Sequence, residues 1–116
     1  MNAQLETQLQ ALGDSTRRGI LAQLRSGPVN VAELARRFPV SRPAISQHLR
    51  VLKEAQLVRD RAVGARRFYE LDPAGFASLR DYFDQFWSQA LASFQRHVES
   101  VDSDAAAAAQ TRKERR

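Results

Sequence analysis

The segment Ser41–Val58, with the sequence SRPAISQHLRVLKEAQLV, combines helical periodicity with side chains that can hydrogen bond to a nucleobase. Ile45, Leu49 and Leu52 fall within about 60° of one another at 100° per residue, so they predict one buried face. On the opposite side, glutamine can pair with an adenine edge through two hydrogen bonds, and serine can donate or accept one. The residues that we assign to DNA contact are Arg42, Pro43, Ser46, Gln47, His48 and Arg50.

A plain solvated helix face is the alternative interpretation of this segment. Such a face typically carries glutamate and lysine four residues apart, whereas here Lys53 and Glu54 occur only near the end. The positive end of the helix and Arg42 favour a nearby phosphate. His48 lies next to this face, and it either contacts a backbone phosphate or packs against another helix. We therefore favour DNA recognition over solvation.

A cationic hairpin is predicted directly after this helix. Two β-prone runs, Leu57–Val63 and Arg66–Leu71, flank the dipeptide Gly64-Ala65. The arginines that we assign to DNA here are Arg59, Arg61, Arg66 and Arg67. Charged residues also occur on hairpins to block edge pairing, but four arginines exceed what that requires. A basic hairpin beside a recognition helix favours contact with the minor groove or its flanking phosphates.

Capping residues and glycine or proline breaks divide the rest of the chain into helices. Residues 3–12 predict a short amphipathic helix, because leucines recur there at helical spacing. Later helices are expected to begin at the N-caps Asp14, Asn30, Ser41 and Asp72. Glu33, three residues after Asn30, resembles the second member of a capping box. Two short helices with a brief connection, the second opening at Ser41, indicate a helix-turn-helix.

Composition limits the class of protein. The length of 116 residues suits one domain, and the absence of cysteine excludes disulfides and thiolate metal sites. The overall charge of +5 is uneven: residues 14–71 carry +7 and residues 72–104 carry −4, which indicates a surface for a polyanion. No apolar run is long enough to cross a membrane, and the first residues lack signal-peptide character, so we expect a cytoplasmic protein without membrane contact.

Three ordered motifs carry a family resemblance. ALGDSTRRGILAQL, VAELARRFPVSRPAISQHLRVLKEAQLV and VGARRFYEL together resemble the ArsR (arsenic-repressor-like) family of bacterial transcriptional regulators. The resemblance implies a mainly α (α+β) winged helix-turn-helix fold of four helices, two strands and a fifth helix. It implies a recognition helix over Ser41–Ala55 and a wing over Val58–Leu71. We therefore expect a sequence-specific DNA-binding protein, most simply a repressor, although sequence leaves repression and activation open.

The resemblance also implies a homodimer formed by the first and last helices. The apolar pattern agrees, because it offers more apolar surface than one small domain can cover. The predicted interface residues are Leu5, Leu9, Phe83, Phe86, Trp87, Ala90 and Phe94. Packing of these side chains on their own core is the alternative. A dimer would place two recognition helices about one turn of double-stranded DNA apart, so the operator should be an imperfect palindrome.

The sequence departs from the metal-binding patterns of the family. The helix that carries cysteine ligands in one subgroup corresponds here to Asn30–Phe38, which contains none. For the other frequent site, Asp84 and His97 fit the spacing, but the remaining two positions are Phe86 and Ser100. Zinc requires about four well-placed ligands. We expect a member without metal or cofactor, either constitutive or released by an unknown small molecule or partner. A metal at a non-standard site stays an alternative.

An enzyme and a protein-interaction module are the two other function classes that a chain of this kind could represent. Catalysis needs convergent titratable groups, and this chain has two histidines and no paired-carboxylate or phosphate-loop motif, so we expect no enzyme. A winged-helix protein-interaction module without specific DNA binding is the stronger rival, although such modules usually lose the basic helix and wing.

We expect one winged-helix domain with its dimerisation helices over residues 1–104, followed by a basic, flexible tail over 105–116.

Overall fold

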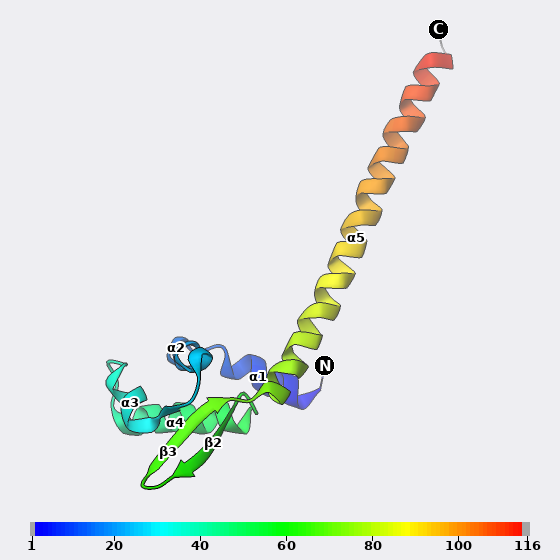
Figure 1. Cartoon of the computed structure of the whole chain (residues 1–116). Coiled ribbons are helices and arrows are strands. Elements are labelled where there is room, and N and C mark those ends of the chain that lie inside the picture. Colours follow the sequence, from blue (N-terminus) through cyan, green and yellow to red (C-terminus); the bar gives the residue numbers. More distant parts are fainter. Residues whose placement is uncertain (1, 115–116) are drawn as a thin grey trace. The chain divides into compact units, whose positions relative to one another are not determined.

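The computed structural model describes residues 2–114, and the chain divides after Arg80 into two compact units (Figure 1). In chain order the elements are α1 (Ala3–Ala11), α2 (Ser15–Gln23), the 3₁₀ helix η1 (Leu24–Ser26), β1 (Val29–Asn30), α3 (Val31–Arg36), α4 (Arg42–Glu54), β2 (Val58–Val63), β3 (Arg66–Leu71) and α5 (Pro73–Glu114). Helix α5 begins in the first unit, and its later residues form the described part of the second. The mainly helical winged-helix order expected from the sequence is confirmed.

The core of the first unit is built from one apolar face of each helix. Its largest fully buried apolar side chains are Ile20, Leu24, Leu34, Ile45, Leu49, Leu52, Leu57 and Val58. Burying a leucine or isoleucine completely contributes about 1.5–3 kcal/mol, so this cluster is the main source of stability in the unit. Three of these residues belong to α4, which is therefore held firmly against the other helices.

The helix starts follow the predicted capping residues. The side chains of Asp14, Asn30 and Ser41 each accept a hydrogen bond from the backbone N–H three residues later, at 3.0, 2.9 and 3.2 Å. Asp72 accepts from the amide of Ala74 at 3.0 Å. These bonds satisfy amides that a helix leaves free at its start. The carboxylate of Glu33 accepts from Arg36 and Arg37, and the arginine bonds lower its pKa.

The sheet has three antiparallel strands in the order β1-β3-β2. The pairs Val58–Leu71 and Val63–Arg66 fix the register of the hairpin, which matches the sequence prediction within one residue. Strand β1 was not predicted, because two residues cannot establish an alternating pattern. It pairs Val29 with Tyr69 and Asn30 with Phe68, and so connects the start of α3 to the hairpin.

The start of α5 lies against the connection between α4 and β2. A Cβ atom on Gly75 would lie 1.6 Å from the carbonyl oxygen of Gln56, so only glycine fits there. The carbonyl of Gly75 accepts a hydrogen bond from the fully buried side chain of Gln8 on α1 at 3.1 Å. Gln56 itself adopts a positive φ of 60°, which is incompatible with a continued α-helix and so separates α4 from β2. These contacts fix the first turn of α5 on the first unit.

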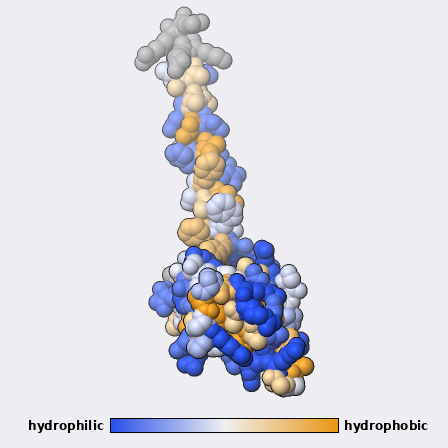
Figure 2. Space-filling model, turned by 90° about the vertical axis from the view of Figure 1, so that its left-hand side faces the viewer, coloured by the Kyte–Doolittle hydropathy of each residue, from blue (hydrophilic) through white to orange (hydrophobic). Residues whose placement is uncertain are grey.

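The second unit consists, over its described residues, of α5 from Asp81 onward. Its large apolar side chains are exposed, since the unit contains no second element to cover them; Figure 2 shows this apolar surface distributed along the helix. The helix continues through residue 104 to Glu114, without a break where the tail was expected to begin. The last two tail residues, 115 and 116, lie outside the described part. Within residues 2–114 no helix is both long and apolar enough to span a bilayer.

Candidate nucleic-acid interface

Helix α4 separates its buried and exposed residues sharply. Ile45, Leu49 and Leu52 are all 0% exposed, and the cap at Ser41 sets the helix start. Because the buried residues occupy one face, the opposite face is directed to solvent. Of the residues assigned to DNA on this helix, Arg42, Pro43, Ser46, Gln47 and Arg50 are exposed. The arrangement offers hydrogen-bonding groups with no competing carboxylate among them.

His48 is placed differently from the other predicted residues of α4. Its side chain is 23% exposed and faces the start of α2, with Nδ1 3.4 Å from a guanidinium nitrogen of Arg17 and 3.8 Å from Asp14. Arg17 also donates to the backbone carbonyl of Ala11 at 2.7 Å. The amide of Arg17 lowers the pKa of Asp14 by hydrogen bonding to its carboxylate. This position favours the helix-packing role of His48 over a phosphate contact.

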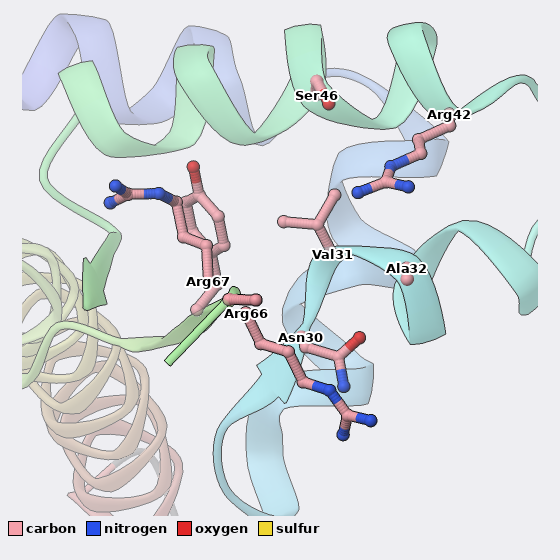
Figure 3. A pocket seen from close by; sticks show the side chains of 9 residues that line it. Asn30, Val31, Ala32, Arg42, Ser46, Arg66 and Arg67 are labelled. Atoms are coloured by element: carbon pink, nitrogen blue, oxygen red, sulfur yellow. The ribbon is translucent and has the colours of Figure 1, made fainter. Parts of the chain in front are cut away.

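An open groove of about 440 Å³ lies between α4, the start of α3 and the hairpin (Figure 3). Arg42 and Ser46 contribute from α4, and Arg66 and Arg67 from β3. Figure 3 shows the two β3 arginines leaving the strand in opposite directions, Arg67 toward α4 and Arg66 toward Asn30, as alternation along a strand requires. The groove therefore has cationic groups on two of its sides.

Sequence reasoning missed several residues of this groove. Asn30, Val31, Ala32 and Tyr69 also line it, although the sequence did not assign any of them to DNA contact. They arrive there because β1 pairs with β3, which brings the start of α3 next to the hairpin. A two-residue strand leaves no signal that could have predicted this arrangement.

Among the residues that the structure describes, two of the four arginines of the hairpin form ion pairs within the protein, and the other two do not. Arg59 donates to Glu70 at 3.1 Å, and Arg67 forms an ion pair with Asp60. Asp60 also accepts from Lys53 on α4 at 2.8 Å. Arg61 and Arg66 are exposed, and no ion pair between described residues involves either of them. The charges of Arg61 and Arg66 are thus the uncompensated ones on the hairpin.

Comparison with known proteins identifies the family. The model of the bacterial regulatory protein arsR family matches residues 14–60, which include α2, α3 and α4. The HTH-type transcriptional regulator Rv2034 of Mycobacterium tuberculosis is 55% identical over 95 residues, or 82% of this chain and 89% of that protein. The chain belongs to the ArsR family. Its activity is therefore transcriptional regulation and not catalysis.

Other relatives of this ArsR-family protein agree with that assignment. The transcriptional repressor SdpR of Bacillus subtilis is 39% identical over 62 residues, covering 53% of this chain and 69% of SdpR. A crystal structure described as a possible transcriptional regulator for arsenical resistance has a TM-score of 0.64 at 54% identity, over 69% of this chain and 83% of that one. An ArsR-like regulator from Rhodococcus sp. RHA1 has a TM-score of 0.69 at 33% identity, and the match covers 84% of this chain and 93% of that one.

The residues predicted for the dimer interface differ in exposure. Leu5 is only 8% exposed and belongs to the core of the first unit, so little of its surface is left for a partner. Leu9 is half-buried. On α5, Phe83, Phe86, Trp87 and Phe94 are 49 to 66% exposed, and Ala90 is exposed beside them. The apolar surface that remains available is thus concentrated on α5.

The possible metal donors are scattered over the part of the chain that the structure describes. Within these residues no group of three or more His, Cys, Asp or Glu side chains is close enough to hold an ion. Asp84 and His97, the two residues that fit a family metal-site spacing, both lie on α5 in the second unit. Each chain therefore offers two donors at that spacing, half of what zinc requires.

Proposed function

We propose that this ArsR-family protein is a sequence-specific DNA-binding repressor that acts as a homodimer. The division of α4 supports this most strongly: three residues with no exposure fix the helix, and Ser46, Gln47 and Arg50 on its other face are exposed. A helix so fixed can enter the major groove, where Gln47 would contact an adenine edge and Arg50 a guanine or a phosphate. The side chains of α4 would then determine most of the protein's preference for one DNA sequence over another.

The groove and hairpin supply contacts with the DNA backbone in this proposal. Arg42 is the first residue of α4, at the end of the helix where the helix dipole and free amides favour a phosphate. Arg61 and Arg66 have uncompensated charges that a second run of phosphates or the adjacent minor groove would attract. These contacts orient the protein on any duplex, whereas α4 discriminates between sequences.

The dimer is proposed from the apolar stripe of α5. Side chains as large as Phe86, Trp87 and Phe94, more than half exposed, leave an apolar surface that monomeric proteins rarely retain. A second copy would cover this stripe. Two symmetric copies present two α4 helices, so the operator is an imperfect palindrome.

We also infer that DNA binding needs no metal. The chain has no cysteine, and the two α5 donors Asp84 and His97 would need further ligands from elsewhere. If the protein is released from DNA by an effector, that effector would then be a small molecule and not a metal ion.

Fluorescence anisotropy with purified protein tests these points together. A labelled duplex from upstream of the gene is compared with a scrambled duplex of equal length, both in EDTA. We expect the upstream duplex to bind at least about 10³-fold more tightly, and EDTA to leave the affinity unchanged. Selection from random duplexes replaces the upstream DNA if no preference appears. Failure to bind any duplex at low salt would contradict the proposal and favour a protein-interaction module.

A further inference from the structure

Asp60 occupies an unusual position for a carboxylate in a basic hairpin. Its side chain is 7% exposed, and its two oxygens have separate cationic partners: Oδ1 accepts from Lys53 at 2.8 Å, and Oδ2 accepts from Arg67. Hydrogen bonding by Lys53, followed by that of Arg67, holds the pKa of Asp60 below its ordinary value. The group is therefore a charged acceptor at neutral pH. We call Lys53, Asp60 and Arg67 the Asp60 cluster.

The Asp60 cluster joins three elements. Lys53 lies in the last turn of α4, Asp60 in β2, and Arg67 in β3. Because Asp60 pairs with Tyr69 in the register, and Arg67 stands two residues before Tyr69, both side chains lie on one face of the hairpin. Lys53 and Arg67 are themselves about half exposed, at 55% and 53%, so the carboxylate is the enclosed member of the cluster.

The cluster stands where the packed part of the hairpin ends. Val58 is 2% exposed, whereas every residue from 61 to 67 is exposed. The tip of the hairpin, residues 61–67, therefore has no buried apolar side chain that would hold it toward α4. Charge-assisted hydrogen bonds from α4 and β3 to one carboxylate can perform that task, since they are short and directional.

We propose that Asp60 is a positioning residue for DNA binding, which fixes the wing against the recognition helix through Lys53 and Arg67. The inference rests on the proposed DNA-binding function of the hairpin. It gives Arg67, which the sequence assigned to DNA contact, a role within the protein instead. Arg61 and Arg66 then approach the DNA at an orientation that the Asp60 cluster determines.

The change Asp60→Asn tests the proposal, because electrostatics alone and loss of the Asp60 cluster would alter DNA affinity in opposite directions. Asp60→Asn removes a negative charge from the interface, so electrostatics alone would tighten binding to every duplex and steepen its salt dependence. Loss of the cluster would instead misplace the wing. For Asp60→Asn we expect binding about tenfold weaker, with the slope of log K against log salt shallower by about 1–2.

Glu70→Gln is the matched control. It makes the same change of charge on the same hairpin, but Glu70 pairs with Arg59 inside the hairpin, at 3.1 Å, and not with α4. We expect its affinity and slope to equal or exceed those of the wild type. Equal or tighter binding by Asp60→Asn, following Glu70→Gln, would overturn the proposal. Unfolding of part of the sample would lower the active fraction without changing the slope.

Hydrogen exchange of the full-length protein without DNA separates this inference from the proposed function. Peptides covering residues 58–71 should exchange faster in Asp60→Asn than in Glu70→Gln, with α2 and α3 unchanged. Unaltered exchange in the hairpin would refute the positioning role even if DNA binding fell. If the wild type bound no DNA at all, the proposed function would fail, while the exchange result would still decide whether Asp60 holds the hairpin.

Discussion

The two units of the chain distribute their apolar residues in opposite ways. In the first unit Ile45, Leu49 and Leu52 of α4 are completely buried, and the exposed face of this helix is polar and cationic. In the second unit Phe86, Trp87 and Phe94 are 59, 62 and 66% exposed along one helix. The first unit therefore completes its core from its own elements, and its surface suits a polyanion. The second has apolar surface that its own residues leave uncovered, which suits a second copy.

Replacing Trp87 tests this contrast with the largest expected effect. Trp87→Ala should convert dimers to monomers, because it removes a large side chain from the centre of the stripe. Affinity for the operator should fall by about 100-fold or more, since the two α4 helices would no longer bind as one molecule. Sedimentation velocity and anisotropy measure the two effects. Gln85→Ala, at an exposed polar position on the same helix, should leave both unchanged. A Trp87→Ala protein that still sediments as a dimer would place the interface elsewhere.

The exposed face of α4 is tested by a smaller change. Gln47→Ala should weaken binding to the operator by about 1–3 kcal/mol and leave binding to a scrambled duplex unchanged, because only base contacts discriminate sequence. Titrations with both duplexes under one salt condition provide the comparison. Gln89→Ala, which removes the same group from the second unit, serves as the control. Equal losses on the two duplexes would mean that Gln47 orients the protein without contacting bases.

Two arginines of the hairpin sharpen the contrast further. Arg66 has an uncompensated charge, whereas Arg59 is paired with Glu70 at 3.1 Å. Arg66→Ala should therefore reduce the salt slope by about 0.9, and Arg59→Ala should reduce it less, because its charge is already balanced. Salt titrations of the two variants on one duplex measure the difference. Identical slopes would show that the ion pair opens on DNA, so that the free structure does not predict which arginines contribute.

Local pattern was enough to predict α4 and its two faces. The cap at Ser41, the proline after it and the three apolar residues all act within one helix, so their consequences appear in the sequence. The same holds for the start of α5, where Asp72 and Pro73 indicate the first turn.

The groove and the Asp60 cluster were beyond this kind of prediction. The two residues of β1 are recognised as a strand only because they pair with β3. That pairing joins Val29 to Tyr69, forty residues later in the chain. The sequence does not show which hairpin arginines form ion pairs, and the contact of Arg67 with Asp60 appears only in the folded chain. Leu5 was likewise assigned to the interface from its type, while tertiary packing buries it.

The pH dependence of stability gives the smallest expected effect and tests the first unit alone. The folded-state pKa of Asp60 lies below its ordinary value of 3.8, because Lys53 and Arg67 bond to its charged form. A lowered pKa means stabilisation that is complete above the unfolded pKa and is lost as pH falls through the folded one. Asp60→Asn should thus lower the unfolding free energy by about 1–2 kcal/mol at neutral pH, since its partners are half exposed. Urea titrations should show this difference constant down to about pH 5 and shrinking below it. Asp14 and Glu33 also have lowered pKa values, but both are present in the two proteins, so their contributions cancel from the difference. A difference that did not shrink in acid would mean that the aspartate contributes through packing and not through its charge.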